Sequence, residues 1–324
     1  MRFCFYTEDL GGIAVLCVDG IAPKGLNLSH WPGNRTPQDF KADSSTEIVL
    51  LFNKSPERDA LISGLDIVSN THYDTDGYLS VAAVLYPEKA GEISELLIET
   101  AITGDFRRYT RDAALKLDLV ISGFSGKGSP IYSQIKDMPE AEKRQMLYDR
   151  LLEEFNSLES LADRYPELWE DEFYQIKREL EGFDQGKIRV DHYPDADLSV
   201  IYSVDELHEI TRNTLCPHSR LLWCQKSGDY YQYRFWYLVD SWFELVSRKC
   251  RARHDLNPLL NRLKEMEYDR NIVWKSGSLS DPVVTVSAYD EKNEVTESTI
   301  HAEIVCDEFL KYLVQQDNQE YSCE

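Results

Sequence analysis

Residues 69–80, SNTHYDTDGYLS, join an apolar run to a helix-like run and therefore predict a strand, an acidic turn and a helix. His72, Asp74 and Asp76 occupy alternate positions of this turn, and alternate side chains of an extended segment point the same way. One turn can thus aim an imidazole and two carboxylates into one pocket. Such donors suit a hard divalent cation such as Mn²⁺ or Mg²⁺ better than a structural zinc ion.

The first 122 residues alternate strand-like apolar runs with helix-like runs. Alternation of this kind predicts an α/β fold with a mostly parallel sheet core and flanking helices. We expect strands at 2–6, 13–18, 47–52, 66–70 and 117–122, and helices at 56–61, 79–85 and 90–103.

A loop rich in glycine and serine, GFSGKGSP at 123–130, interrupts this pattern. Leucines at helical spacing then predict a charged helical stretch through 139–181. We divide the chain into an α/β domain at 1–125, a helical connector or cap at 126–186 and a smaller α+β region at 187–324. In the last region we expect helices at 204–214, 258–266 and 302–314, a hairpin of 220–225 with 230–237, and a strand at 283–288.

Charge and cysteine usage restrict the partners and the compartment. The net charge of −22 predicts no binding to long duplex nucleic acid, which depends on neutralising phosphates. The seven cysteines are widely spaced, and an odd count without a C-x-x-C pair argues against a disulfide framework. No apolar run is long enough to span a bilayer, and residues 1–9 turn acidic too early for a signal peptide. We expect a cytoplasmic protein that does not bind membranes. A homodimer is one possible oligomeric state, and the sequence does not decide it.

The spacing His72-x-Asp74-x-Asp76-Gly77-x-x-Ser80 resembles the first motif of the DHH phosphoesterase superfamily. That superfamily includes single-strand exonucleases, nanoRNases, exopolyphosphatases and manganese pyrophosphatases. The resemblance implies that His72, Asp74 and Asp76 bind one or two divalent metal ions at the end of a parallel strand.

Two segments upstream extend the resemblance. The strand-like residues 13–20 end in Asp19-Gly20 and look like the single-aspartate motif of the superfamily. The string LSHWPGN, which contains His30, resembles the D-H-H strand end, and KADSSTE at 41–47 resembles the small-residue segment that follows it. The resemblance implies that Asp19 and His30 complete the ligand set.

The order of these motifs is unusual, because the superfamily places the D-x-D turn first. The resemblance therefore implies a circularly permuted domain, and it covers roughly residues 13–85. The LSHWPGN, KADSSTE and HYDTDG strings also resemble those of an uncharacterised bacterial family, which brings no assigned activity.

The chain departs from the superfamily at two positions. Ser29 stands where the superfamily has an aspartate, and Trp31 stands where it has the second histidine. The glycine-rich C-terminal motif of many members is also absent. A competing hypothesis keeps the conventional order and completes the site with Asp191 and His192, which follow a strand-like run.

A phosphohydrolase also needs cations that hold phosphate oxygens. The basic segment 247–254 reverses the local charge of an acidic chain, and a second basic segment follows residue 104. The residues that we consider for substrate binding are Asn34, Lys41, Arg107, Arg251, Arg253 and His254.

These observations predict a metal-dependent phosphoesterase or phosphohydrolase that uses a metal-bound water on a small anionic phosphorylated substrate. We expect His30, Asp74 and Asp76 to be catalytic. The alternative is a ligand-binding or protein-interaction module on the same scaffold, in which Ser29 and Trp31 stand in place of ionisable groups that catalysis needs.

Overall fold

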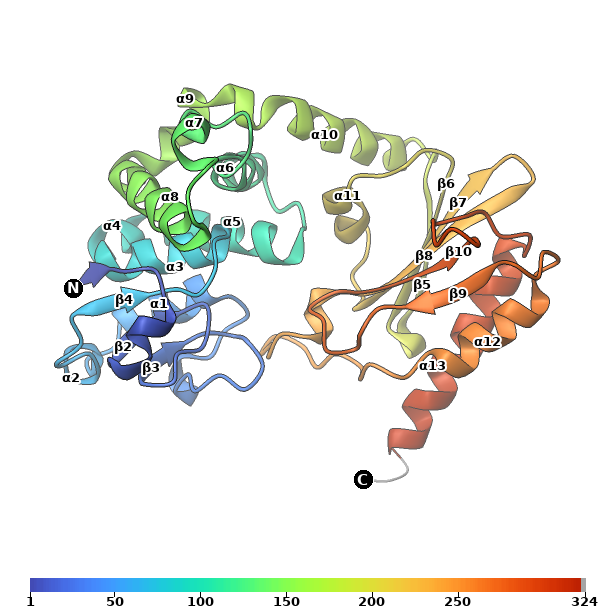
Figure 1. Ribbon diagram of the computed structural model, residues 1–324, viewed down its shortest axis with the longest axis horizontal. Helices are drawn as coiled ribbons and strands as arrows, with labels where there is room; N and C mark the ends of the chain where they lie inside the picture. Colours follow the sequence, from blue (N-terminus) through green and yellow to red (C-terminus); the bar gives the residue numbers. More distant parts are fainter. Residues whose placement is uncertain (322–324) are drawn as a thin grey trace. The chain divides into compact units, whose positions relative to one another are not determined.

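The computed structural model describes residues 1–321 and is drawn in Figure 1. Its contacts group the chain into two compact units. The first comprises Met1–Gln175 and Phe243–Arg248, and the second comprises Ile176–Trp242 and the residues from Lys249 onward. The units thus do not follow the three predicted segments, since most of the expected connector at 126–186 packs with the first unit.

The first unit is built on a four-stranded sheet whose three pairings are all parallel. Its strands are β1 (Arg2–Phe3), β2 (Val15–Val18), β3 (Gly25–Leu28) and β4 (Ile67–Ser69), in the order β1-β4-β2-β3. All four residues of β2 are buried, which is typical of a parallel strand covered on both faces. The expected α/β class is confirmed at this level, and the strands predicted at 2–6, 13–18 and 66–70 are present in shorter form.

Gly25 makes the close pairing of β2 and β3 possible. Its φ is +97°, and a Cβ atom at this position would lie 2.0 Å from the carbonyl oxygen of Val15. Only glycine avoids both the strained backbone and this clash.

Among the described residues, the first unit also contains nine α-helices that lie wholly within it. They are α1 (Ser45–Asn53), α2 (Arg58–Leu61), α3 (Thr75–Leu85), α4 (Pro87–Glu92), α5 (Ser94–Phe106), α6 (Asp112–Gly123), α7 (Tyr132–Ile135), α8 (Glu140–Glu154) and α9 (Leu161–Arg164). The next helix, α10 (Glu170–Asp184), contains the boundary between the units at 175/176.

Two predicted strands are wrong, because residues 47–52 belong to α1 and residues 117–122 belong to α6. Ser44 caps α1, and its Oγ accepts the Glu47 N–H. Both helices are buried over most of their surface, so polar residues do not recur in them every three to four positions, as they do in a half-exposed helix. Their continuous apolar runs therefore resemble buried strands.

The second unit contains a six-stranded mixed sheet in the order β5-β6-β7-β8-β10-β9. Its strands are β5 (Arg189–Tyr193), β6 (Leu198–Ser203), β7 (Arg220–Ser227), β8 (Tyr230–Tyr237), β9 (Val273–Ser276) and β10 (Val284–Tyr289). Only β6 and β7 pair in parallel within it, and the predicted hairpin is formed by β7 and β8. The expected helix at 204–214 is shorter and begins at Glu209 in α11 (Glu209–Thr214).

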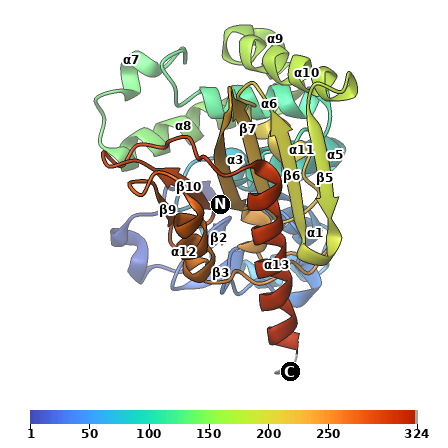
Figure 2. The ribbon, with the colours of Figure 1, turned by 90° about the vertical axis from the view of Figure 1, so that its right-hand side faces the viewer.

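Two helices, α12 (Asn257–Met266) and α13 (Ala302–Tyr321), pack on one face of this second sheet, as Figure 2 shows. Their leucines, valine and phenylalanine share a core with the apolar side chains of β6, β7, β8 and β10. Within residues 1–321, no helix is both long enough and apolar enough to cross a membrane.

Candidate metal centre

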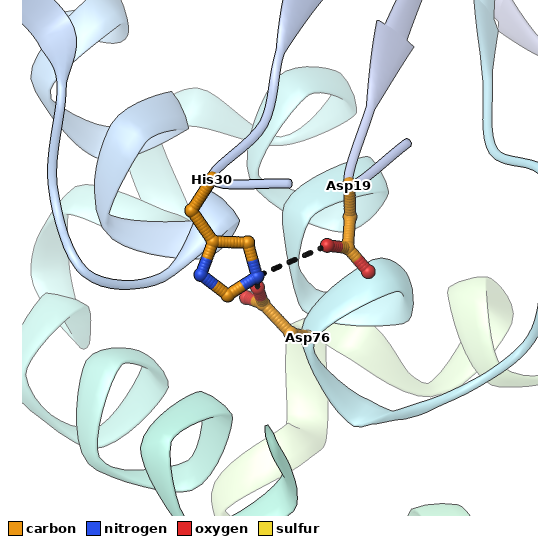
Figure 3. Close-up of side chains that lie close together, drawn as sticks. All are labelled: Asp19, His30 and Asp76. Carbon is orange, nitrogen blue, oxygen red and sulfur yellow. Dashed lines mark ion pairs between the residues drawn. The ribbon is translucent and has the colours of Figure 1, made fainter. Parts of the chain in front are cut away.

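The candidate centre lies where the parallel strands of the first unit end. Asp19 directly follows β2 and adopts a left-handed φ of 46°, which Asp tolerates better than most residues. His30 follows β3, and the turn after β4 leads through His72 into α3. These segments converge because the carboxyl ends of parallel strands meet at one edge of a sheet. Figure 3 shows the imidazole of His30 pointing toward the carboxylates of Asp19 and Asp76.

Helix α1 orients two of these carboxylates. Oδ2 of Asp76 accepts the Ser45 N–H at 2.7 Å, and its Oδ1 accepts the Thr46 N–H at 2.8 Å. Amides at a helix N-terminus have no partner inside the helix, and the helix dipole there favours a negative charge. The hydroxyl of Ser45 also donates to Oδ1 of Asp19 at 2.9 Å.

The tautomer of His30 follows from its partner. Nδ1 lies 2.6 Å from the carbonyl oxygen of Asp43, and it must carry the proton because a carbonyl only accepts. Nε2 faces carboxylate oxygens of Asp105 at 3.3 Å, Asp19 at 3.6 Å and Asp76 at 3.8 Å. Among the described residues, neither this Nε2 nor Oδ2 of Asp19 or Asp105 has a hydrogen-bond partner.

A second group of side chains shares Asp19 with the first. Nε2 of His72 lies 2.7 Å from Oδ2 of Asp74 and 3.1 Å from Oδ2 of Asp19, while the other oxygen of Asp74 caps α3. We call Asp19, His30 and Asp76 the inner trio, and Asp19, His72 and Asp74 the outer trio. In each trio the donor atoms lie within 4.8 Å of one another. The inner side chains are at most 2% exposed, whereas His72 and Asp74 are 24% and 41% exposed.

Burial and crowding shift the ionisation of both trios. Burial and the neighbouring Asp19 raise the pKa of Asp76 to about 6, and burial together with Asp76 raises the pKa of Asp105. Burial favours neutral His30, but Asp105 and Asp19 outweigh it and raise its pKa. Burial also favours neutral Asp19, but His72 and His30 hold its pKa below the usual range. The centre therefore retains protons that a divalent cation would displace.

The orphaned buried atoms fit a divalent cation. Carboxylate oxygens gathered in a dry site repel one another unless a positive charge lies between them, and a divalent cation would supply that charge in place of the protons that the centre retains. The trios offer nitrogen and oxygen donors without a cysteine. With Asp19 shared, the residues have the arrangement expected for one ion or two.

Asp105 is the site residue that sequence reasoning missed. It lies near the end of α5, and its side chain is 6% exposed. Its segment stands out in the sequence only for its arginines, and Asp105 has no characteristic spacing relative to the motifs. The only available signal was an aspartate next to a glycine at the end of an apolar helix.

Ser29 and Trp31, the two positions that differ from the resembled motif, take part in the local structure. Oγ of Ser29 accepts the N–H groups of Gly20 and Trp31, at 3.1 Å and 3.2 Å, and so joins the segments after β2 and β3. The ring of Trp31 lies against His72, with ring centroids 5.0 Å apart. Asp105 supplies a carboxylate beside His30 that Ser29 does not.

Asp191 and His192 lie on β5 in the second unit. Nδ1 of His192 lies 3.0 Å from Oγ of Ser199, and Asp191 forms an ion pair with Arg189. Within the described part of the chain, both trios draw their ligands from the first unit alone. Within the first unit the structure brings His30 to Asp76.

Three candidate substrate-binding residues of the first unit have partners inside it. Asn34 and Lys41 both contact the carboxylate of Glu244, at 2.9 Å and 3.0 Å. Arg107 forms an ion pair with the buried Asp118 at 3.2 Å. These contacts hold loops and helices of the unit together.

The three candidates from the basic segment lie in the second unit. Arg253 donates to the hydroxyl of Ser241 and to four backbone carbonyls, which commits most of its guanidinium N–H groups. Nε2 of His254 lies 2.6 Å from Asp317, and Nε of Arg251 lies 4.0 Å from the same carboxylate. These three candidates for phosphate binding thus contact loops and α13 of their own unit.

Comparison with known proteins identifies a family. Neither the curated proteins nor the solved structures contain a significant match to this chain. Residues 1–322, which include both units, match a family of unknown function, DUF6687. The chain therefore belongs to the DUF6687 family.

Proposed function

We propose that this protein is a metal-dependent phosphohydrolase that acts on a small anionic phosphorylated substrate. One or two Mn²⁺ or Mg²⁺ ions would be held by the inner and outer trios. The observation that carries the proposal is the buried Nε2 of His30, which faces three carboxylate oxygens and has no hydrogen-bond partner among residues 1–321. A cation satisfies this arrangement, which otherwise is a costly way to build a core.

The two trios suit different tasks. In the inner trio the Asp43 carbonyl and the α1 amides fix His30 and Asp76, so this group is buried and preorganised. In the outer trio His72 and Asp74 are partly exposed, so a substrate can reach them. When bound there, a divalent cation lowers the pKa of a water molecule and neutralises the charge that develops on the phosphoryl group.

The charge of the chain favours a small substrate. A net charge of −22 repels a long polyanion, whereas cations in the trios reverse the field locally for a small one. We place the reaction in the cytoplasm, since the six cysteines within the described residues are free thiols.

Hydrolysis by the purified protein tests the proposal. Release of phosphate or alcohol from a panel of small phosphoesters and phosphoanhydrides is measured with Mn²⁺ and with EDTA. Asp74→Asn and Asp76→Asn each abolish the Mn²⁺-dependent turnover, and Asp39→Asn, which changes an exposed carboxylate of the same unit, leaves it intact. Unchanged turnover in both centre variants rules the assignment out.

A second candidate, a ligand-binding or interaction module, is favoured by one observation. Ser29 and Trp31 replace ionisable groups of the resembled superfamily and serve local structure instead. If Mn²⁺ raises the melting temperature but no phosphorylated compound in the panel is turned over, this second candidate replaces the first.

A further inference from the structure

Residues 243–248, which we call the strap, form a segment without helix or strand that belongs to the first unit. The residues before it and after it in the chain belong to the second unit. Among the described residues beyond Gln175, only the strap belongs to the same unit as the candidate metal centre.

The strap contacts His30 directly. The ring of Phe243 stacks on the imidazole with centroids 3.7 Å apart and an angle of 19° between the planes. The ring of Phe243 also meets that of Phe106, the neighbour of Asp105, in an edge-on arrangement with centroids 5.7 Å apart. The backbone N–H of Glu244 donates to the carbonyl oxygen of His30 at 2.8 Å.

The same segment gathers the loop that follows His30. The carboxylate of Glu244 accepts the Gly33 N–H at 2.9 Å and also contacts the side chains of Asn34 and Lys41. Burial raises the pKa of Glu244, but Lys41 and the Gly33 amide outweigh this and lower it, so the carboxylate stays charged.

The strap also holds Asp43, the partner of the His30 ring. Oδ1 of Asp43 accepts the backbone N–H groups of Val246 at 2.7 Å and Ser247 at 3.0 Å. The carbonyl oxygen of Asp43 is the acceptor of the His30 Nδ1 proton. The imidazole is thus restrained by a stacked ring, by its backbone and by the residue that fixes its tautomer.

We propose that the strap is a positioning element that orients His30 Nε2 toward Asp19, Asp76 and Asp105 and thereby sets the metal affinity of the inner trio. The proposal rests on the proposed function, since it concerns the same centre. Groups that orient a histidine ligand commonly change metal affinity by 10- to 100-fold when they are altered. The strap residues would act through His30 and would not touch the ion.

Calorimetric titration of the full-length, metal-free protein with Mn²⁺ tests this role. Phe243→Leu removes the stacked ring and keeps an apolar side chain, and we expect it to weaken Mn²⁺ binding by about 10- to 100-fold. Glu244→Gln removes the charge next to Lys41 at nearly constant size, and we expect a loss of about 10-fold. Val246→Ala is the matched control, because this side chain is 55% exposed and the contact of Val246 with Asp43 is made by its backbone.

A second measurement does not depend on metal. The ring Nδ1–H of His30, assigned by its absence in His30→Gln, gives a slowly exchanging proton signal in the metal-free wild type and in Val246→Ala. We expect this signal to broaden or disappear in Phe243→Leu and Glu244→Gln. If the wild type binds no Mn²⁺, the metal site fails and this signal alone decides the role of the strap. Wild-type affinity and an unchanged signal in both strap variants overturn the positioning role.

Discussion

Asp76→Asn provides a quantitative test of the electrostatics of the centre. In the folded, metal-free protein the pKa of Asp76 is raised from 3.8 to about 6, chiefly by burial and by Asp19. The folded state therefore binds this proton more tightly than the unfolded chain does. The resulting stability is fully present below pH 3.8 and is lost as the pH rises through 6.

The magnitude follows from the two pKa values. The pKa of Asp76 is higher in the folded state than in the unfolded chain by about two. This difference corresponds to about 3 kcal/mol of unfolding free energy, which is lost between pH 4 and pH 7. Asparagine cannot ionise, so the stability of Asp76→Asn lacks this dependence on pH. The substitution also removes the negative charge of Asp76, which raises the pKa of Asp105. The variant places an amide NH₂ against an α1 backbone N–H, at a cost of about 1–3 kcal/mol that does not depend on pH.

The assay is urea unfolding in EDTA from pH 4 to pH 7, for the wild type, Asp76→Asn and the exposed control Asp39→Asn. The chain contains two units and can unfold in two steps, so the transition that Mn²⁺ shifts in the wild type identifies the first unit. We expect the stability difference between wild type and Asp76→Asn to change by about 3 kcal/mol over this range. With Mn²⁺ the wild type gains most at pH 7, where Asp76 is ionised, and Asp76→Asn gains little.

A stability difference that stays constant from pH 4 to pH 7 would refute the reasoning. It would mean that the Asp76 carboxylate is solvated or paired more effectively than its position among Asp19, Asp105 and His30 indicates. Asp39→Asn should track the wild type at every pH.

Two further predictions concern buried carboxylates outside the trios. The hydroxyl of the buried Thr75 donates to Asp118 at 2.6 Å, and Asp118→Ala removes this acceptor. We expect the Mn²⁺-responsive unfolding transition to lose about 1–3 kcal/mol of stability. Asp118→Asn keeps an acceptor and should lose less. Asp317→Ala leaves the fully buried Arg220 without its carboxylate partner, and we expect the second unit to lose about 3–5 kcal/mol in urea unfolding while the Mn²⁺-responsive transition stays in place. Equal shifts of both transitions by Asp317→Ala would contradict the division into two units.

Local patterns predicted the strands and turns that carry the candidate ligands. β2 and β4 are short apolar runs followed by polar turns, so Asp19 and Asp74 could be assigned to strand ends. Their convergence follows from parallel pairing, which an α/β alternation implies. For this reason His30 and Asp76, which lie 46 positions apart, could be proposed as neighbours from the sequence.

The remaining features depend on tertiary packing. The run at 47–52 is helical because Ser44 caps it and because the helix is buried on several sides, which hides the helical period. Asp105 reaches the centre from a helix, and nothing in its immediate sequence marks a ligand. Phe243 lies more than 200 residues from His30, and only packing brings the two rings together.

The strap has a consequence for the order of events during synthesis. The ribosome completes Gln175 some 73 residues before Arg248, which at about 5–20 residues per second is a delay of roughly 4–15 s. During this interval the nascent first unit carries its acidic cluster and His30, but it still lacks the Phe243 ring that stacks on the imidazole. If the protein binds metal as we propose and the strap sets its affinity, tight metal loading becomes a late event, which occurs after translation has passed the strap.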